Sequence, residues 1–243
     1  MERSFSRSVQ ADGREIHYCL ERKQVRNLNL RIRHDGSVFV SANDDVPFAE
    51  IDEFVCRKAS YILAAIGKFE MIAQYRPQPK QYVSGETFMI LGRGLRLKVL
   101  RSRKDSIVSD GITIFLSVKE LDDMEKRRRI IVRFLDRQCK AVFGEIIKAV
   151  YPMFRKYGLA MPTLRIREME TRWGSSLVKK GIITLNKRLL ESPRNCIEYV
   201  VMHEFCHFIH PNHSKSFYGF LTMLMPDWRE RKAILEKQAI YWL

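Results

Sequence analysis

Four of the six histidines lie within residues 203–213, beside a glutamate and in an otherwise apolar segment. Within this segment His203, Glu204 and His207 form an HExxH motif. Histidines four residues apart share one face of a helix, so both imidazoles can bind one metal ion. Glu204 directly follows the first histidine, and a carboxylate at that position can act as general base toward a water molecule. The motif predicts a metal-dependent hydrolase.

A third protein ligand requires the chain to turn after this helix. A helix rises about 1.5 Å per residue, so His210 on a straight helix would lie roughly 10 Å along the axis from His203. Pro211 disfavours helical geometry at the residue before it, and Asn212 favours a turn. A reversal there would bring His213 back toward the motif. His213 follows His203 by ten residues, as does the last histidine of the metzincin pattern HExxHxxGxxH.

Three residues are candidates for the third ligand. We favour His213, followed by His210 and then Glu230, and His210 is also a candidate for supporting a ligand or contacting substrate. Catalytic zinc typically has three protein ligands and one open position, so zinc is the expected ion. Manganese, cobalt and nickel remain alternatives, because imidazoles bind each of them.

Segments of the last third of the chain resemble a known family. The segments are RWGSS (172–176), IITLNKRLLESP (182–193), IEYVVMHEFCHFIHPNHSKSFY (197–218) and MPDW (225–228). They are similar to the YgjP-like predicted zinc metallopeptidases, which are related to the SprT and WLM groups. Usual members have RWGSC and HELCHL, whereas this chain has Ser176, Phe205 and Phe208, none of them at a ligand position.

The resemblance implies a site and a fold. It implies that His203, His207 and His213 bind zinc and that Glu204 is the base. It also implies a gluzincin-like core with a short sheet beside the HExxH helix. A bacterial relative is associated with splitting UTP into UMP and pyrophosphate, so the family predicts the metal centre better than the substrate.

The substrate is therefore open between peptides and nucleotides. For a peptide, an extended substrate would pair with the edge of strands around Trp173 and Thr184. For a nucleoside triphosphate, Arg172, Lys187 and Arg188 would offset the phosphate charge. Trp173 would form a wall of the cleft in either case.

The overall charge adds a third hypothesis. Lysine and arginine number 43 against 28 acidic residues, which gives a formal net charge of +15. Such a charge attracts anionic partners, so an SprT-like protease or a binding module associated with nucleic acid is also considered. The run 126–129 would be its footprint.

Composition and termini bear on the compartment. The first residues contain no apolar core of signal-peptide length, and no segment approaches the roughly 18 uncharged residues that span a bilayer. The five cysteines are scattered and match neither a disulfide framework nor a CxxC zinc motif. We therefore expect a cytoplasmic protein without a membrane partner.

The elements that position the motif predict an α+β fold. Apolar residues alternate in 28–40 around a turn at Asp35-Gly36, and a helix of about five turns follows Pro47. The other expected elements are hairpins turning at Gly92 to Gly94 and at Asp110-Gly111, a helix over 121–151 ended by Pro152, strands at 164–168 and 181–185, and three further helices after Pro193.

These elements predict two regions. A small β-rich region with one helix would occupy residues 1–119, and the helical HExxH core would occupy 120–243. A connector containing Pro77 and Pro79 lies inside the first region. The sequence shows no internal repeat.

Overall fold

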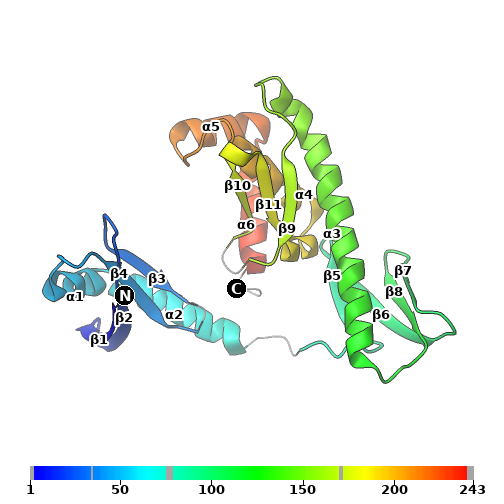
Figure 1. Ribbon diagram of the computed structural model, residues 1–243, viewed down its shortest axis with the longest axis horizontal. Coiled ribbons are helices and arrows are strands. Elements are labelled where there is room, and N and C mark those ends of the chain that lie inside the picture. The colour runs from blue at the N-terminus through cyan, green and yellow to red at the C-terminus, as the bar shows by residue number, and fades with distance from the viewer. Residues whose placement is uncertain (1–2, 34, 75–78, 170–171, 240–243) are drawn as a thin grey trace. The chain divides into compact units, whose positions relative to one another are not determined.

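The computed structural model describes residues 3–33, 35–74, 79–169 and 172–239, and shows the predicted α+β fold (Figure 1). The chain forms two compact units, residues 1–77 and 78–242. The sequence placed the division at residues 119 and 120 instead. Pro77 of the predicted connector lies outside the described residues. No helix in the described ranges is both long and apolar enough to cross a membrane.

The first unit is a four-stranded sheet with two helices. Its strands have the order β1-β2-β4-β3, with β2 and β4 parallel and the outer pairs antiparallel. The predicted hairpin of residues 28–40 is β3 and β4. The single predicted helix is interrupted at Lys58, which separates α1 from α2. The bounds are β1 Arg3–Ala11, β2 Arg14–Arg22, β3 Asn29–Ile32, β4 Val38–Ala42, α1 Phe48–Arg57 and α2 Ala59–Gln74.

The second unit begins with another four-stranded sheet. Its order is β5-β6-β8-β7, again with a parallel central pair and antiparallel outer pairs. Both predicted hairpins are present, with turns at Leu91-Gly92 and at Asp110-Gly111. The bounds are β5 Thr87–Ile90, β6 Arg93–Arg101, β7 Ser106–Ser109 and β8 Thr113–Val118.

The two sheets share one topology, which the sequence did not reveal. In each, a tight turn with two residues at positive φ joins the first two strands, Asp12-Gly13 in one and Leu91-Gly92 in the other. In each, an aspartate before a glycine accepts a bond from the amide two residues later: Asp35 from Ser37 and Asp110 from Ile112, both at 2.9 Å. The chain therefore contains a structural repeat.

Helix α3 (Met124–Arg155) follows the second sheet. Asp123 caps it by accepting a bond from the Lys126 amide at 2.8 Å. The predicted stop at Pro152 is wrong, because the helix continues through this proline to Arg155. The helix contacts β7, β8 and α4 (Arg194–Cys206).

A three-stranded sheet and three helices complete the second unit. The sheet has the order β10-β11-β9, with β11 buried along its whole length. Strand β10 directly follows Trp173, around which a strand was expected without stated bounds. Helix α4 contacts β10, β11, α3, α5 and α6. The bounds are β9 Thr163–Arg167, β10 Gly174–Leu177, β11 Ile182–Asn186, α5 Lys215–Leu224 and α6 Trp228–Ala239, with short 3₁₀ helices η1 Val178–Lys180 and η2 Lys187–Glu191.

Apolar packing explains the position of the division. The strands β5 to β8 contribute Leu97, Ile114 and Leu116 to the same buried cluster as Ile146 of α3 and Val201 of α4. A separate cluster, built around β2, β4 and α1, belongs to the first unit. The second sheet is thus part of the core that carries the HExxH helix.

Candidate metal centre

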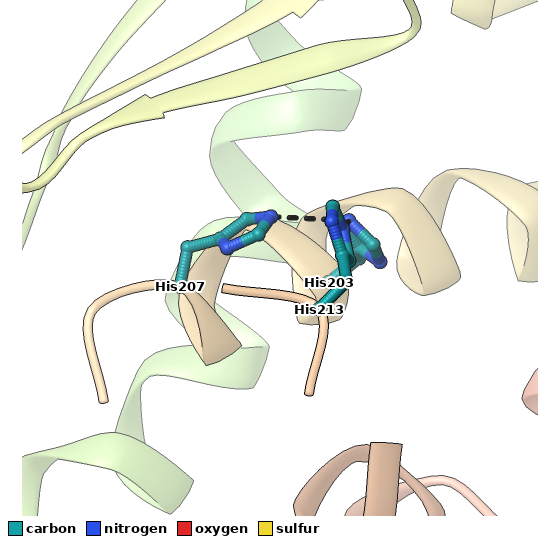
Figure 2. Close-up of side chains that lie close together, drawn as sticks. All are labelled: His203, His207 and His213. Carbon is teal, nitrogen blue, oxygen red and sulfur yellow. Dashed lines mark hydrogen bonds between the residues drawn. The ribbon is translucent and has the colours of Figure 1, made fainter. Parts of the chain in front are cut away.

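Three imidazoles converge in the second unit (Figure 2). His203 lies on α4, His207 caps its C-terminal end, and His213 lies in the loop before α5. Nε2 of His203 is 3.2 Å from Nε2 of His207 and 3.0 Å from Nε2 of His213. One ring nitrogen from each of the three residues lies within 4.8 Å of the others. Their role as metal ligands remains a prediction, but the structure brings the three rings together.

The chain reversal that this requires is present. Helix α4 ends at Cys206, whose carbonyl accepts bonds from the amides of Ile209 at 3.1 Å and His210 at 2.8 Å. Ser214 then caps α5 by accepting a bond from the Phe217 amide at 3.3 Å. These short-range bonds close a turn that returns His213 to the helix.

The alternative ligands lie apart from the triad. The His210 ring packs 5.3 Å from the Phe220 ring, measured between centroids. Among the described residues, neither His210 nor Glu230 belongs to the group of side chains that could share an ion.

The surroundings favour the neutral form of His203 and His207. The buried ring of Phe217 lies 4.8 to 4.9 Å from all three imidazoles, centroid to centroid. Burial, together with the charges of His207 and His213, lowers the pKa of His203 to about 3. Burial also lowers the pKa of His207. Neutral imidazole is the form that binds a metal.

This donor set fits a divalent transition metal. Two ligands at 2.0 to 2.1 Å from a tetrahedral ion lie about 3.3 Å apart, close to the observed nitrogen separations. Nδ1 of His207 lies 3.2 Å from the Pro211 carbonyl, and donation to that oxygen leaves Nε2 free as a ligand. Nδ1 of His203 is buried without a hydrogen-bond partner in the described structure.

Glu204 is buried against strand β10. The Ser176 hydroxyl donates a hydrogen bond to its Oε2, and a Cβ at Gly174 would lie 2.7 Å from its Oε1. Burial raises the pKa of Glu204 to about 7, while the Ser176 bond and the charge of Arg172 act in the opposite direction. The carboxyl therefore exchanges a proton near neutral pH.

Comparison with known proteins identifies the family. The model of the YgjP-like family, described as a metallopeptidase domain, matches residues 26–238. The chain belongs to the YgjP-like family. It is therefore a metal-dependent hydrolase of the metallopeptidase type.

The other comparisons add little to this assignment. The crystal structure of the metallopeptidase zymogen abylysin from Pyrococcus abyssi is similar to part of this YgjP-like chain, with 23% identity and a TM-score of 0.33. The similarity covers 39% of this chain and 90% of abylysin. None of the curated proteins compared with it gave a match.

The predicted substrate residues of this YgjP-like protein do not form one group. Lys187 forms an ion pair with Asp136 at 2.6 Å. The charge of Arg188 acts on Glu191, whose pKa burial raises to about 7. Only Arg172 is close enough to influence the pKa of Glu204.

Trp173 and Thr184, the two other residues proposed for substrate binding, lie at different places relative to the three-stranded sheet. Trp173 is partly buried against the core of the second unit, beside the start of β10. Thr184 is buried in the central strand β11, whereas β10, which begins directly after Trp173, is an edge strand of the sheet, so pairing of a substrate with this edge stays a prediction.

Sequence reasoning missed several residues that build the YgjP-like site. Asn186 is buried at the end of β11, and its side-chain amide donates to the carbonyls of Met169 at 2.7 Å and Arg172 at 2.8 Å. The signal in the sequence that could have identified Asn186 is an asparagine directly after an apolar strand. The packing of Phe217 against the imidazoles and of Gly174 against Glu204 is not revealed by spacing along the chain.

Proposed function

We propose that this YgjP-like protein is a zinc-dependent peptidase. His203, His207 and His213 hold the ion, and Glu204 is the general base. The observation that carries the proposal is the convergence of three imidazole nitrogens beside a buried carboxyl. That carboxyl belongs to Glu204, the residue after His203, and it accepts a hydrogen bond from Ser176.

The protein side chains and the ion have separate tasks. A bound zinc ion supplies Lewis acidity, which polarises a carbonyl and lowers the pKa of water. Glu204 accepts the proton of the attacking water and returns it to the leaving amine. Ser176 orients the carboxyl for this transfer through its hydrogen bond to Oε2.

Strand β10 supports a peptide substrate. It is an edge strand of its sheet, and it carries Ser176, which reaches the proposed base. An extended peptide can add to such an edge through backbone hydrogen bonds. A peptide bound there would lie next to Glu204.

The nucleotide alternative has less support from the structure. It invoked Arg172, Lys187 and Arg188, but Lys187 is paired with Asp136 and Arg188 lies near Glu191. Arg172 is the one member coupled to Glu204. Hydrolysis of nucleoside triphosphates is therefore the second arm of the activity test.

Metal analysis tests the ligands. We expect about one zinc per chain in the purified protein, and loss of the ion in His203→Ala and in His207→Ala. His210→Ala is the matched control, because its ring lies apart from the triad, and should retain the ion. Stoichiometric metal in both ligand variants would refute the assignment.

Activity measurements test the substrate. We expect cleavage of unfolded casein, reduced by roughly 10² to 10⁴ in Glu204→Gln. The same preparations are assayed with a panel of nucleoside triphosphates. Hydrolysis of a triphosphate that depends on Glu204, without cleavage of casein, would show that the peptidase proposal is wrong.

A further inference from the structure

A basic groove lies between β7 and the first half of α3, on residues that do not belong to the triad or to the β10 edge. Its volume is about 470 Å³. It is lined by basic, hydroxyl and apolar side chains and by one carboxylate: Asp105, Ser106, Ile107, Lys126, Arg129, Ile130, Arg133 and Arg137.

Three of these side chains form a line of positive charge. Arg129, Arg133 and Arg137 are exposed and follow one another at four-residue intervals on α3. None of the three has an acidic partner within the described ranges, although Arg129 donates to the Glu125 carbonyl at 3.4 Å. Like charges at this spacing repel one another and destabilise a helix. An anion bound along the line would offset that repulsion.

The one acidic residue of the groove does not neutralise this line. Asp105 pairs with Lys126, whose Nζ lies 3.3 Å from its Oδ2. Three arginine charges therefore face the groove without compensation from its lining.

The structure also divides the basic run that the sequence singled out. Arg127 is buried, and its guanidinium donates to the backbone carbonyls of Gln81, Tyr82 and Leu121. Arg128 pairs with Glu125 at 3.2 Å. The charges free to bind an anion thus follow the helix face instead of the consecutive run.

We propose that this groove binds the phosphate backbone of a single-stranded nucleic acid. Four-residue intervals place successive guanidinium groups about 6 Å apart along the axis, a spacing suited to successive phosphates of one strand. Guanidinium groups match phosphate oxygens with two parallel hydrogen bonds. Ile107 and Ile130 give sugars or bases an apolar surface to pack on. A concave groove suits a single strand, whereas the major groove of a duplex accepts a protruding element.

Fluorescence anisotropy with a labelled 20-nucleotide oligo(dT) tests this proposal on the full-length protein. We expect binding at 0.1 M salt that Arg133→Gln/Arg137→Gln weakens about tenfold or more. The slope of log K against log salt should fall in magnitude by about 1.4, because each phosphate contact to a single strand contributes about 0.7. An unchanged zinc content shows that the variant is folded.

A charge-matched variant provides the control. Arg96→Gln/Lys98→Gln also removes two positive charges, from exposed positions of β6 that do not line the groove. Its affinity should remain within about twofold of the unaltered protein. Equal weakening in both double variants would overturn the proposal, as would the absence of oligo(dT) binding at 0.1 M salt.

Two competitors distinguish other occupants. A 20-base-pair duplex should bind less tightly than oligo(dT), and polyglutamate of equal charge should compete poorly. Stronger binding of the duplex, or equal competition by polyglutamate, would overturn the assignment to a single strand. The assay measures binding without hydrolysis, so its outcome is independent of the proposed peptidase activity.

Discussion

The carboxyl of Glu204 is enclosed by small residues of a neighbouring strand. Ser176 donates to Oε2, and Gly174 leaves space for Oε1. Both contacts lie on β10, so the strand that offers a backbone edge also fixes the proposed base. A side chain at position 174 would compete directly with the carboxyl for space.

Gly174→Ala should therefore reduce activity while the metal stays bound. The new Cβ would lie 2.7 Å from Oε1 and 2.9 Å from Cγ of Glu204, so the carboxyl must move. A displacement of about 1 Å at a catalytic group costs about a hundredfold in rate. Casein cleavage and zinc content are measured on the same sample. Gly219→Ala on α5 is the control, because its Cβ would meet nothing within 4 Å. Full activity of Gly174→Ala would contradict the packing described for Glu204.

The pH profile gives a second prediction at this scale. A general base acts only when ionised, and burial raises the pKa of Glu204 to about 7. We expect kcat/KM for casein to fall about tenfold per pH unit below this value. The Ser176 bond lowers the pKa of Glu204, so Ser176→Ala should move the acid limb to higher pH. A profile that stays in place in this variant would show that the bond does not act on the base.

Among the elements, the segment before β10 depends on one buried amide. Asn186 at the end of β11 binds the carbonyls of Met169 and Arg172, and its Oδ1 accepts a bond from the Arg188 amide at 3.2 Å. Arg172 lies two residues before the strand that contacts Glu204. A single side chain thereby fixes the entry to β10.

Asn186→Ala should lower the free energy of unfolding by about 1 to 3 kcal/mol, because the two hydrogen bonds donated by the buried amide are lost. Urea unfolding measures the change. Gln81→Ala, at an exposed position of the same unit, should change stability by less than about 0.5 kcal/mol. Equal urea midpoints for the two variants would show that the amide does not support the segment.

Local sequence patterns predicted most helices and strands. The features that were not predicted depend on contacts between residues far apart in the sequence. Apolar spacing and the residues Pro211 and Asn212 predicted the HExxH helix and the reversal that follows it. The bounds of β10 were not predicted, because Gly174 and Ser176 have little intrinsic strand preference and pairing with β11 determines their conformation. Lys187 and Asp136 are far apart in the sequence, so their ion pair could not be predicted from it. Without that pair, Lys187 was a plausible substrate residue.

At the scale of the whole molecule, each unit has an apolar cluster of its own. The triad, Glu204, Phe217 and β10 all belong to the second unit, and its cluster extends from β5 to α6. The sequence placed the boundary later, because the change from sheet to helix near residue 120 resembled a domain boundary. The structural repeat was not predicted from the sequence. Beyond the Asp-Gly turns, its two sheets share mainly an alternation of apolar residues.

A fragment of residues 79–243 should therefore fold alone and bind about one zinc per chain. Its size is sufficient for an independent core. Cooperative urea unfolding and metal analysis check the two parts of this expectation. The same fragment with His203→Ala should unfold cooperatively without bound zinc. A fragment lacking a cooperative transition would show that the first unit is needed for folding.

Helix α3 connects two distinct parts of the second unit. Arg133 lines the basic groove, and Ile146, about 20 Å further along the axis, lines another cavity together with Met202 of α4. A continuous helix keeps this separation constant. A polymer anchored at Arg133 would consequently be tethered at a set reach from the hydrolytic centre, and any protein travelling on that polymer would be presented to the enzyme at a raised local concentration.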